Sequence, residues 1–139
     1  MEIEFPYAEE ESGVLNTVKR PRIKMDALSE LASDWITIDE VLADTGADFC
    51  VLPRYIGETL IKDITTGKYA EIKGVVPGTI MVAYVYQIKV RIGNLEFEAP
   101  VAIADSNDVP AIFGRADALD RFDANFSKGE RVKLQWDGE

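Results

Sequence analysis

The longest alternating pattern in the sequence lies at residues 79–92, and it restricts the fold more than any other feature. Apolar side chains occur there at every second position, which places them on one face of an extended strand. They are Ile80, Val82, Tyr84, Tyr86, Ile88, Val90 and Ile92. The opposite face is apolar at Met81, Ala83 and Val85 and polar at Gln87, Lys89 and Arg91. The segment is therefore predicted to be a long strand, apolar on both faces near its start and half solvated near its end.

Short strand-like segments separated by turn residues lie on both sides of this pattern. Together they make about nine expected strands, the others being residues 35–43, 50–52, 59–65, 69–76, 95–104, 111–113, 123–126 and 131–135. Two weaker candidates, residues 1–5 and 21–27, flank a predicted acidic turn at residues 9–13. One short helix is expected at residues 115–121. This succession predicts an all-β domain, either a small barrel or a sandwich.

One domain is expected across residues 1–139, with residues 1–30 as an amino-terminal hairpin or extension of it. The length is in the usual range for one domain, and folding should bury roughly two-thirds of the surface of the unfolded chain. No internal repeat, low-complexity tract or linker-like change of composition is found. The 47% of hydrophobic residues and 29% of charged residues are typical of a globular protein.

The absence of histidine from the sequence excludes several catalytic classes. Without histidine there is no Ser-His-Asp triad, no Cys-His pair and no histidine-ligated zinc. The single cysteine, Cys50, allows neither an internal disulfide nor a cysteine-rich metal site, and it is expected to be a small buried side chain. Catalysis would therefore depend on carboxylates, hydroxyl groups, lysines or a borrowed cofactor, and we predict no cofactor and no metal.

The net charge of -10, from 25 acidic and 15 basic residues, argues against a nucleic-acid partner. The one basic cluster, residues 19–24, is interpreted as a solvated strand edge, with an anion site as the alternative. Asp105, Asn107 and Asp108 have the composition of a calcium site without its regular spacing, so a solvated loop is preferred. No apolar stretch of membrane length and no signal-peptide pattern is found, which with the free cysteine predicts no membrane partner and a cytoplasmic location.

The most informative motif is Asp44-Thr45-Gly46-Ala47. A turn with Asp and Gly commonly reflects backbone geometry alone. Here, however, apolar strands at residues 36–43 and 50–52 flank the turn and bring Asp44 close to the core. A carboxylate in such a place is costly unless it is hydrogen-bonded or protonated. A chance match to Asp-(Thr or Ser)-Gly-Ala is expected in on the order of one in a few hundred chains of this length. The motif is therefore a candidate for the catalytic centre.

This motif resembles the active-site loop of the retroviral-type, retropepsin-like aspartic peptidases. Two later segments resemble features of that family in the same order. They are Gly74-Val75-Val76-Pro77-Gly78, which is similar to the tip of the flap that covers the substrate, and Ile112-Phe113-Gly114-Arg115, which is similar to the segment after the second wide loop. Residues 116–126 resemble the short helix and closing strand of the family. The resemblance covers about residues 36–134 and implies a single-lobe acid-protease barrel.

The resemblance implies an aspartic endopeptidase that acts on a peptide or protein substrate as a homodimer. One aspartate cannot activate water and also protonate the scissile carbonyl, whereas two carboxylates at one site share a proton because their charges repel each other. At about 4 Å and an effective dielectric constant near 20, this repulsion is roughly 4 kcal/mol. Since Asp-Thr-Gly occurs once in the sequence, each subunit would supply its own Asp44 across a two-fold axis.

The match to the family motif also implies roles for the neighbours of Asp44. Thr45 would form a hydrogen bond across the subunit interface and lock the two active-site loops together. Gly46 would allow close approach of two backbones, and its N–H would donate to the carboxylate. Ala47 and Asp48 would border the backbone of the substrate.

Further roles implied by the family fall on the later segments. Arg115 would pair with Asp48, although this ion pair is equally interpreted as structural. Gly114 would let its segment pass close behind the active-site loop. Val75 and Val76 would exclude water and contact apolar substrate side chains. A plain hairpin turn at Pro77-Gly78 is the alternative to the flap.

Two other functions stay open from the sequence. The first is a binding or assembly module that keeps the protease fold with weak or no catalysis. The second is a carboxylate hydrolase of another fold, such as a glycosidase, which would need a second acid about 5–10 Å from Asp44. In viral members of the family the terminal strands form the dimer interface, whereas residues 135–139 here are few and polar. We therefore expect either an interface made by other strands, such as the amino-terminal hairpin, or a weak dimer.

Overall fold

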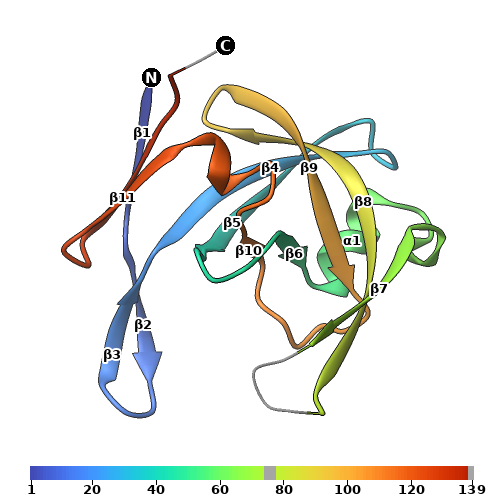
Figure 1. Cartoon of the computed structure of the whole chain (residues 1–139), viewed down its shortest axis with the longest axis horizontal. Coiled ribbons are helices and arrows are strands. Elements are labelled where there is room, and N and C mark those ends of the chain that lie inside the picture. Colours follow the sequence, from blue (N-terminus) through green and yellow to red (C-terminus); the bar gives the residue numbers. More distant parts are fainter. Residues whose placement is uncertain (74–77, 138–139) are drawn as a thin grey trace.

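The computed structural model describes residues 1–73 and 78–137, and most of them belong to β-strands (Figure 1). In chain order the strands are β1 (Glu2–Pro6), β2 (Ala8–Ser12), β3 (Asn16–Arg20), β4 (Arg22–Ser29), β5 (Asp34–Ala43), β6 (Cys50–Leu52), β7 (Lys68–Lys73), β8 (Ile80–Ile92), β9 (Leu95–Ala104), β10 (Ile112–Phe113), β11 (Asp123–Ser127) and β12 (Arg131–Gln135). The α-helix α1 (Arg54–Leu60) follows β6, and 3₁₀ turns lie at Ile64–Thr66 and Leu119–Arg121.

Seven of the strands form one sheet that closes into a barrel. Their order is β4-β5-β10-β6-β9-β8-β7, and β4 also pairs with β8, which joins the two sides of the sheet. At this closure the Arg91 guanidinium donates to Asp26 at 2.9 Å and lies 4.3 Å from the centre of the Trp35 ring. Burial acts to raise the pKa of Asp26, but hydrogen bonds from Thr37 and Arg91 outweigh it and hold that pKa below its ordinary value. A barrel is therefore present, as one of the two expected all-β forms.

The terminal strands form a second, smaller sheet beside the barrel. Its order is β1-β12-β11, with β12 antiparallel to both neighbours. Met1 and Trp136 exchange two main-chain hydrogen bonds at 2.9 Å, so both ends of the described chain lie together at the upper left of Figure 1. The paired strands expected at residues 123–126 and 131–135 are confirmed, and residues 1–5, a weak candidate, form most of β1.

The core lies inside the barrel and follows the alternation of the long strands. In the second half of β8, Ile88, Val90 and Ile92 are buried, whereas Gln87 and Lys89 are exposed. This half confirms the predicted pattern. The expectation of apolar residues on both faces near the start of β8 is largely confirmed, since one face packs in a small cluster around Ala83 and the other packs Tyr84 and Tyr86 against the main core. Only Ile80, at the very start of the strand, is 56% exposed. The beginning of β8 pairs with β7 in a hairpin at the edge of the sheet, where less of the protein covers it.

Two expectations about helices and strands are corrected. The strand predicted at residues 59–65 is wrong, because α1 ends at Leu60 and a 3₁₀ turn follows at Ile64–Thr66. The helix packs directly on β9, and a Cβ atom at Gly57 would lie 2.3 Å from Ile103. Local β-branched residues favoured a strand there, whereas the contact with β9 requires a helix with a glycine. The helix expected at residues 115–121 is only the 3₁₀ turn Leu119–Arg121, although Ala118, Leu119 and Phe122 are buried.

The predicted acidic turn at residues 9–13 is also corrected. Its three glutamates lie in β2, which pairs with β3 to form a separate two-stranded hairpin. The turn itself comes after them, where the Ser12 hydroxyl oxygen accepts from the N–H groups of Val14 and Leu15 at 3.3 and 3.2 Å. The strand is compatible with clustered glutamates because Arg22 and Arg20 both pair with Glu10.

None of the helices in the described part of the chain combines the length and the apolar character needed to cross a bilayer.

Candidate active site

Asp44 lies at the point where β5 leaves the barrel sheet. Its carboxylate oxygen Oδ1 accepts a hydrogen bond from the N–H of Gly46 at 2.8 Å. The Asp44 N–H donates to the carbonyl of Phe113 at 3.1 Å, and the Asp44 carbonyl accepts from the N–H of Ala47 at 3.2 Å. These contacts fold residues 44–47 into a tight loop that presents the carboxylate. Asp44 is half-buried, and Thr45 and Gly46 are exposed, so the carboxylate lies at the surface of the barrel rather than deep in its core.

The short strand β10 supports this loop from behind. It runs parallel to β5, with Phe113 beside Ala43, and antiparallel to β6, with Ile112 beside Val51. Main-chain hydrogen bonds continue beyond it, from Arg115 N–H to the Ala47 carbonyl at 3.0 Å and from Ala116 N–H to the Asp48 carbonyl at 2.8 Å. The Asp44 loop is therefore bound by backbone groups on both sides, which keeps its geometry largely independent of side chains.

Gly114 lies where the backbones of the two segments cross. A Cβ atom at this position would be 2.2 Å from the carbonyl oxygen of Phe49, far inside van der Waals contact. The next residue, Cys50, is fully buried, and its burial raises the pKa of the thiol to about 11, so the thiol stays protonated near neutral pH. The expectation of a small buried cysteine is confirmed, and Gly114 lies close behind the loop as predicted.

Asp48 and Arg115 form the expected ion pair, with Arg115 Nη2 3.2 Å from Asp48 Oδ1. The side chains are 80% and 49% exposed, respectively. Exposed pairs of this kind contribute little to the free energy of folding because water screens them. The pair thus orients the Asp48 side chain at the mouth of the site more than it stabilises the fold.

A pocket of about 300 Å³ opens beside the Asp44 loop. It is bordered by Gly46, Ala47 and Asp48 of the loop, by Phe49 and Val51, by Ile72, Lys73 and Met81 of the β7–β8 hairpin, and by Val109, Pro110 and Ile112. Most of these side chains are apolar, so the pocket suits an apolar group held next to the carboxylate. A larger groove of about 710 Å³ lies between β5, α1 and residues 109–111, but no residue of the segment 44–48 lines it, whereas Gly46, Ala47 and Asp48 line the smaller pocket. We therefore take the smaller pocket, which lies beside the Asp44 loop, as the candidate substrate pocket.

Comparisons with solved structures identify the fold. A retropepsin-like aspartic protease from Rickettsia conorii superposes with a TM-score of 0.65 and 20% sequence identity, over 98% of this chain and 92% of that chain. The chain has a retropepsin-like fold. The EIAV protease complexed with the inhibitor HBY-793 is more distant, with a TM-score of 0.48 and 22% identity over 70% of this chain and 83% of that chain. No protein-family model matches the sequence, and no curated protein is significantly similar to it.

Within the retropepsin-like fold, the segment predicted to be the flap tip falls mostly outside the described residues. This applies to Gly74, Val75, Val76 and Pro77. Gly78 is described and has a φ of 87°, a backbone conformation that favours glycine and fits a turn after β7. The hairpin stems on either side, up to Lys73 and from Ile80, pair in register and border the pocket.

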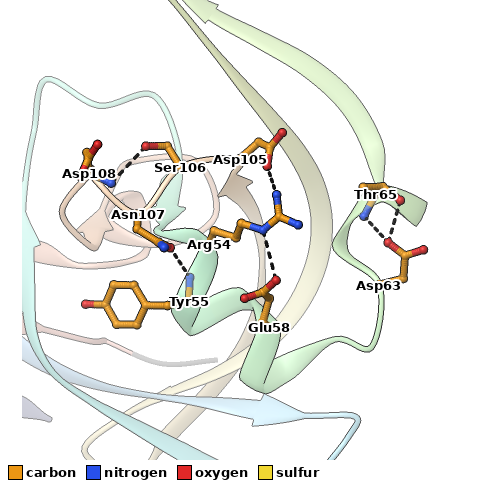
Figure 2. Close-up of polar contacts among 9 residues, drawn as sticks. All are labelled: Arg54, Tyr55, Glu58, Asp63, Thr65, Asp105, Ser106, Asn107 and Asp108. Atoms are coloured by element: carbon orange, nitrogen blue, oxygen red, sulfur yellow. Dashed lines mark hydrogen bonds and ion pairs between the residues drawn. The ribbon is translucent and has the colours of Figure 1, made fainter.

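At Asp105, Asn107 and Asp108 the sequence favours a solvated loop over a calcium site, and all three residues are exposed. Asp105 pairs with Arg54, and Asn107 accepts a hydrogen bond from the Tyr55 N–H at 2.9 Å (Figure 2). Across residues 1–73 and 78–137, no group of three or more His, Cys, Asp or Glu side chains is placed to hold a metal ion.

Sequence reasoning missed the far wall of the pocket. Ile72, Met81, Val109 and Pro110 were not proposed as site residues, yet all four line it. The signal available for the last two was a Val-Pro step between a polar loop and the short apolar segment of β10. Nothing in the sequence connects that step with the β7–β8 hairpin, because the two segments meet only when β9 pairs with β8 on one side and with β6 on the other.

Proposed function

We propose that this protein is an aspartic endopeptidase that hydrolyses peptide bonds with a water molecule activated by two aspartates, one Asp44 from each subunit of a homodimer. The observation that carries the proposal is the Asp44 carboxylate, held by the Gly46 N–H at 2.8 Å beside an apolar pocket. The retropepsin-like fold supports it, since the structure from Rickettsia conorii is described as an aspartic protease.

The chemistry requires two carboxylates with different protonation states. In the dimer, charge repulsion keeps one Asp44 protonated while the other is ionised. The ionised carboxylate takes a proton from water as the oxygen attacks the scissile carbonyl carbon, and the protonated one donates its proton to the carbonyl oxygen. The carboxylate that took the proton of water then gives it to the amide nitrogen, and the carbon–nitrogen bond breaks while a hydroxyl group of the tetrahedral intermediate returns its proton to the other carboxylate. Carboxylates do all of these proton transfers, so the absence of histidine from the sequence is compatible with the reaction.

The residues around Asp44 would assist in distinct ways. Thr45 is exposed at the tip of the loop, and we propose that its hydroxyl binds the partner's loop across the two-fold axis. Ala47 and Asp48 border the pocket and would contact the substrate backbone. Arg115 would orient Asp48 through their ion pair, and Gly114 would let β10 support the loop at close range.

A covering role is proposed for the tip of the β7–β8 hairpin, residues 74–78. Gly74, Val75, Val76, Pro77 and Gly78 connect two strands whose stems border the pocket. We propose that this tip excludes water from the bound peptide and contacts its apolar side chains.

The partner in the homodimer is proposed to contact the β2–β3 hairpin. The terminal strands pair with each other within one chain, and β12 has a neighbour on each side. The hairpin projects from the barrel, and at its turn Val14 is 91% exposed and Leu15 is 64% exposed (Figure 1). Its base is joined to the active-site loop, because the Ala43 N–H donates to the Pro21 carbonyl at 2.9 Å. A second copy bound to this hairpin would therefore lie near Asp44.

Charge favours one edge of the hairpin for such a contact. Two-fold pairing of β3 with its copy around Val18 would place Lys19 opposite Thr17. The same pairing of β2 around Glu10 would place glutamates opposite glutamates, which is destabilising. We therefore propose that β3 provides the edge that faces the second copy.

Two broader features also stay proposals. We propose that residues 1–139 act as one domain, because β1 and β4 of the amino-terminal region both belong to the sheets formed with the rest of the chain. We propose a cytoplasmic location, because a free buried cysteine suits a reducing compartment. The excess of acidic residues argues against a nucleic-acid partner.

A digest of a peptide library from pH 3 to 8 tests the proposal. Wild type should cleave peptides with apolar side chains beside the cut, best at acidic to mildly acidic pH, and a transition-state-mimicking inhibitor of aspartic peptidases should block cleavage. Asp44→Asn should lower the rate by on the order of a thousandfold or more, because general acid–base catalysis is lost. Asp39→Asn, an exposed aspartate on the same strand, is the matched control and should cleave like wild type.

Three results would count against the proposal. Cleavage that persists in Asp44→Asn would exclude the aspartate pair. A protein that stays monomeric at tens of micromolar in light scattering while cleaving normally would exclude the obligate dimer. Binding of peptides without any cleavage would favour the binding module.

A further inference from the structure

The segment between β9 and β10, residues 105–110, has one side on the pocket and the other side on α1. Val109 and Pro110 border the pocket beside Asp44, together with Ala47 and Asp48. The earlier part of the segment, residues 105–108, faces the first turn of α1 (Figure 2). A shift of residues 105–108 relative to α1 can therefore move the pocket residues Val109 and Pro110, which follow directly in the chain.

Polar contacts, rather than burial, hold this segment. Asp105, Asn107, Asp108 and Pro110 are exposed, and Val109 is half-buried against a small apolar cluster. A loop with so little buried apolar surface depends on its hydrogen bonds for a fixed position.

The Asp105 N–H donates to the Val82 carbonyl at 2.8 Å, and two further hydrogen bonds come from the start of α1. Pro53, the residue before the helix, makes no capping side-chain hydrogen bond, so the first N–H groups of the helix need other acceptors. The loop supplies them: the Ser106 carbonyl accepts from Arg54 N–H at 2.9 Å, and Asn107 Oδ1 accepts from Tyr55 N–H at 2.9 Å. The loop thus serves as the cap of the helix, and the helix in turn fixes the loop.

The Arg54 side chain adds a second connection. Its guanidinium group contacts Asp105 at the start of the loop and Glu58 one turn along the helix, the latter at 3.1 Å (Figure 2). Asp105 belongs to the loop, whereas Glu58 belongs to α1 itself. A substitution of Asp105 therefore tests the contact between helix and loop, whereas a substitution of Glu58 tests a contact within the helix.

We infer that Asn107, assisted by Asp105, is a positioning residue that sets the place of Val109 and Pro110 and thereby the preference of the pocket for large apolar side chains of the substrate. This inference rests on the proposed peptidase function and adds a specificity determinant to it. No direct contact of Asn107 with substrate is needed, because its effect passes through the backbone of residues 107–110.

Steady-state cleavage of a matched peptide series tests the inference. The peptides differ only in one side chain beside the cut, from alanine to leucine and phenylalanine. In Asn107→Ala, kcat/KM should fall about tenfold for the large side chains, mainly through KM, and less than about twofold for alanine, since a displaced wall loses apolar contact. Asn107→Asp keeps the acceptor and should restore the wild-type preference. Glu58→Gln is the control and should leave the preference unchanged.

Amide hydrogen exchange gives a readout that does not depend on catalysis. Asn107→Ala should accelerate exchange at residues 105–112 and at Tyr55, whereas Glu58→Gln should not. Unchanged exchange in Asn107→Ala would overturn the inference, and so would an equal loss of kcat/KM for all peptides. If wild type cleaves no peptide, the proposed function fails by itself. The same series, measured as peptide binding by fluorescence anisotropy, then decides the inference, and equal affinities of wild type and Asn107→Ala would overturn it.

Discussion

The Asp44 loop and the β2–β3 hairpin are neighbours in the structure, but different interactions hold them. Backbone hydrogen bonds to β10 and to residues 115–116 hold the loop, and Gly114 permits the close contact behind it. The two strands of the hairpin pair with each other, and side-chain ion pairs add contacts within it and to the rest of the protein. Arg22 contacts Glu10 at 2.8 Å, Arg20 contacts Glu10 at 3.1 Å and Lys19 contacts Glu130 at 3.2 Å.

The difference predicts how each region responds to change. The loop should be more sensitive to steric change than to pH and salt, because close packing and main-chain hydrogen bonds make up most of its contacts. The hairpin should tolerate substitution and respond to pH and salt, because partly exposed ion pairs are weak and screened. The Asp44 loop, which is the more constrained region, contains the proposed catalytic residue. The β2–β3 hairpin, which is the less constrained region, contains the proposed contact with a second copy.

The largest expected loss of stability comes from a substitution at Gly114, behind the Asp44 loop. Gly114→Ala should lower the free energy of unfolding by about 3 kcal/mol, because the new methyl group would overlap the backbone of Phe49. Urea denaturation measures this change. Gly13→Ala is the matched control, since nothing lies within 4 Å of a Cβ atom there, and it should cost less than about 1 kcal/mol. Equal costs for the two variants would contradict the comparison.

A smaller loss is expected where a polar group is buried in the barrel. Ser29 is 1% exposed, and its hydroxyl donates to the Thr59 carbonyl at 2.6 Å and accepts from Ala32 N–H at 3.0 Å. Ser29→Ala should lower the free energy of unfolding by about 2 kcal/mol at any pH from 4 to 8, because both partners lose a buried hydrogen bond. A loss that varied strongly with pH would show that polar contacts in the barrel behave like those of the hairpin.

The tip of the hairpin should affect association rather than folding. The double substitution Val14→Asp and Leu15→Asp should raise the dissociation constant of the dimer about tenfold or more, because charges replace exposed apolar side chains at the proposed interface. Sedimentation equilibrium gives the constant, and urea denaturation should show little change of the monomer. Leu31→Asp, in the turn between β4 and β5, is the control for an added charge at an exposed leucine. The same effect from Leu31→Asp would remove the hairpin from the interface.

The smallest effect is expected from the ion pair at the base of the hairpin. The hydrogen bond from Arg22 lowers the pKa of Glu10 below its ordinary value of 4.5. The contribution of the ionised Glu10 side chain to stability is therefore complete above pH 4.5, and it is lost as pH falls through the lower pKa that Glu10 has in the folded state. Glu10→Gln should cost only a few tenths of a kcal/mol at pH 7, and the difference from wild type should shrink towards pH 3.

Urea denaturation at several pH values measures this difference. Glu9→Gln, on an exposed neighbour in the same strand, should show no such trend. A Glu10→Gln cost that stayed constant from pH 3 to 7 would mean that packing, and not the ion pair, holds the base of the hairpin.

Much of the barrel was predictable from local patterns. The alternation at residues 79–92 identified β8, and apolar runs between turns identified β5, β6, β9 and the β11–β12 pair. The Asp44 motif, the donation from Gly46 and the pairing of Asp48 with Arg115 were predicted as well. These features depend on residues close in sequence or on a family motif, so a single sequence contains the information for them.

The errors have a common cause in contacts between distant residues. The helix α1 was missed because its glycine, Gly57, matters only against Ile103 of β9. Strand β2 was taken for a turn because its glutamates become acceptable only when Arg20 and Arg22 approach Glu10. Local propensity favours the wrong element in both places, and tertiary packing overrides it.

The sequence by itself determined which residues could do the chemistry, since the lack of histidine and the single Asp-Thr-Gly leave Asp44 as the candidate catalytic residue. Tertiary structure alone decided what surrounds that carboxylate. The pocket takes Ile72 and Met81 from one hairpin and Val109 and Pro110 from a loop capped onto α1. These segments meet because β10, β6, β9, β8 and β7 lie side by side in one sheet, through pairings between distant parts of the chain that no short stretch of sequence encodes.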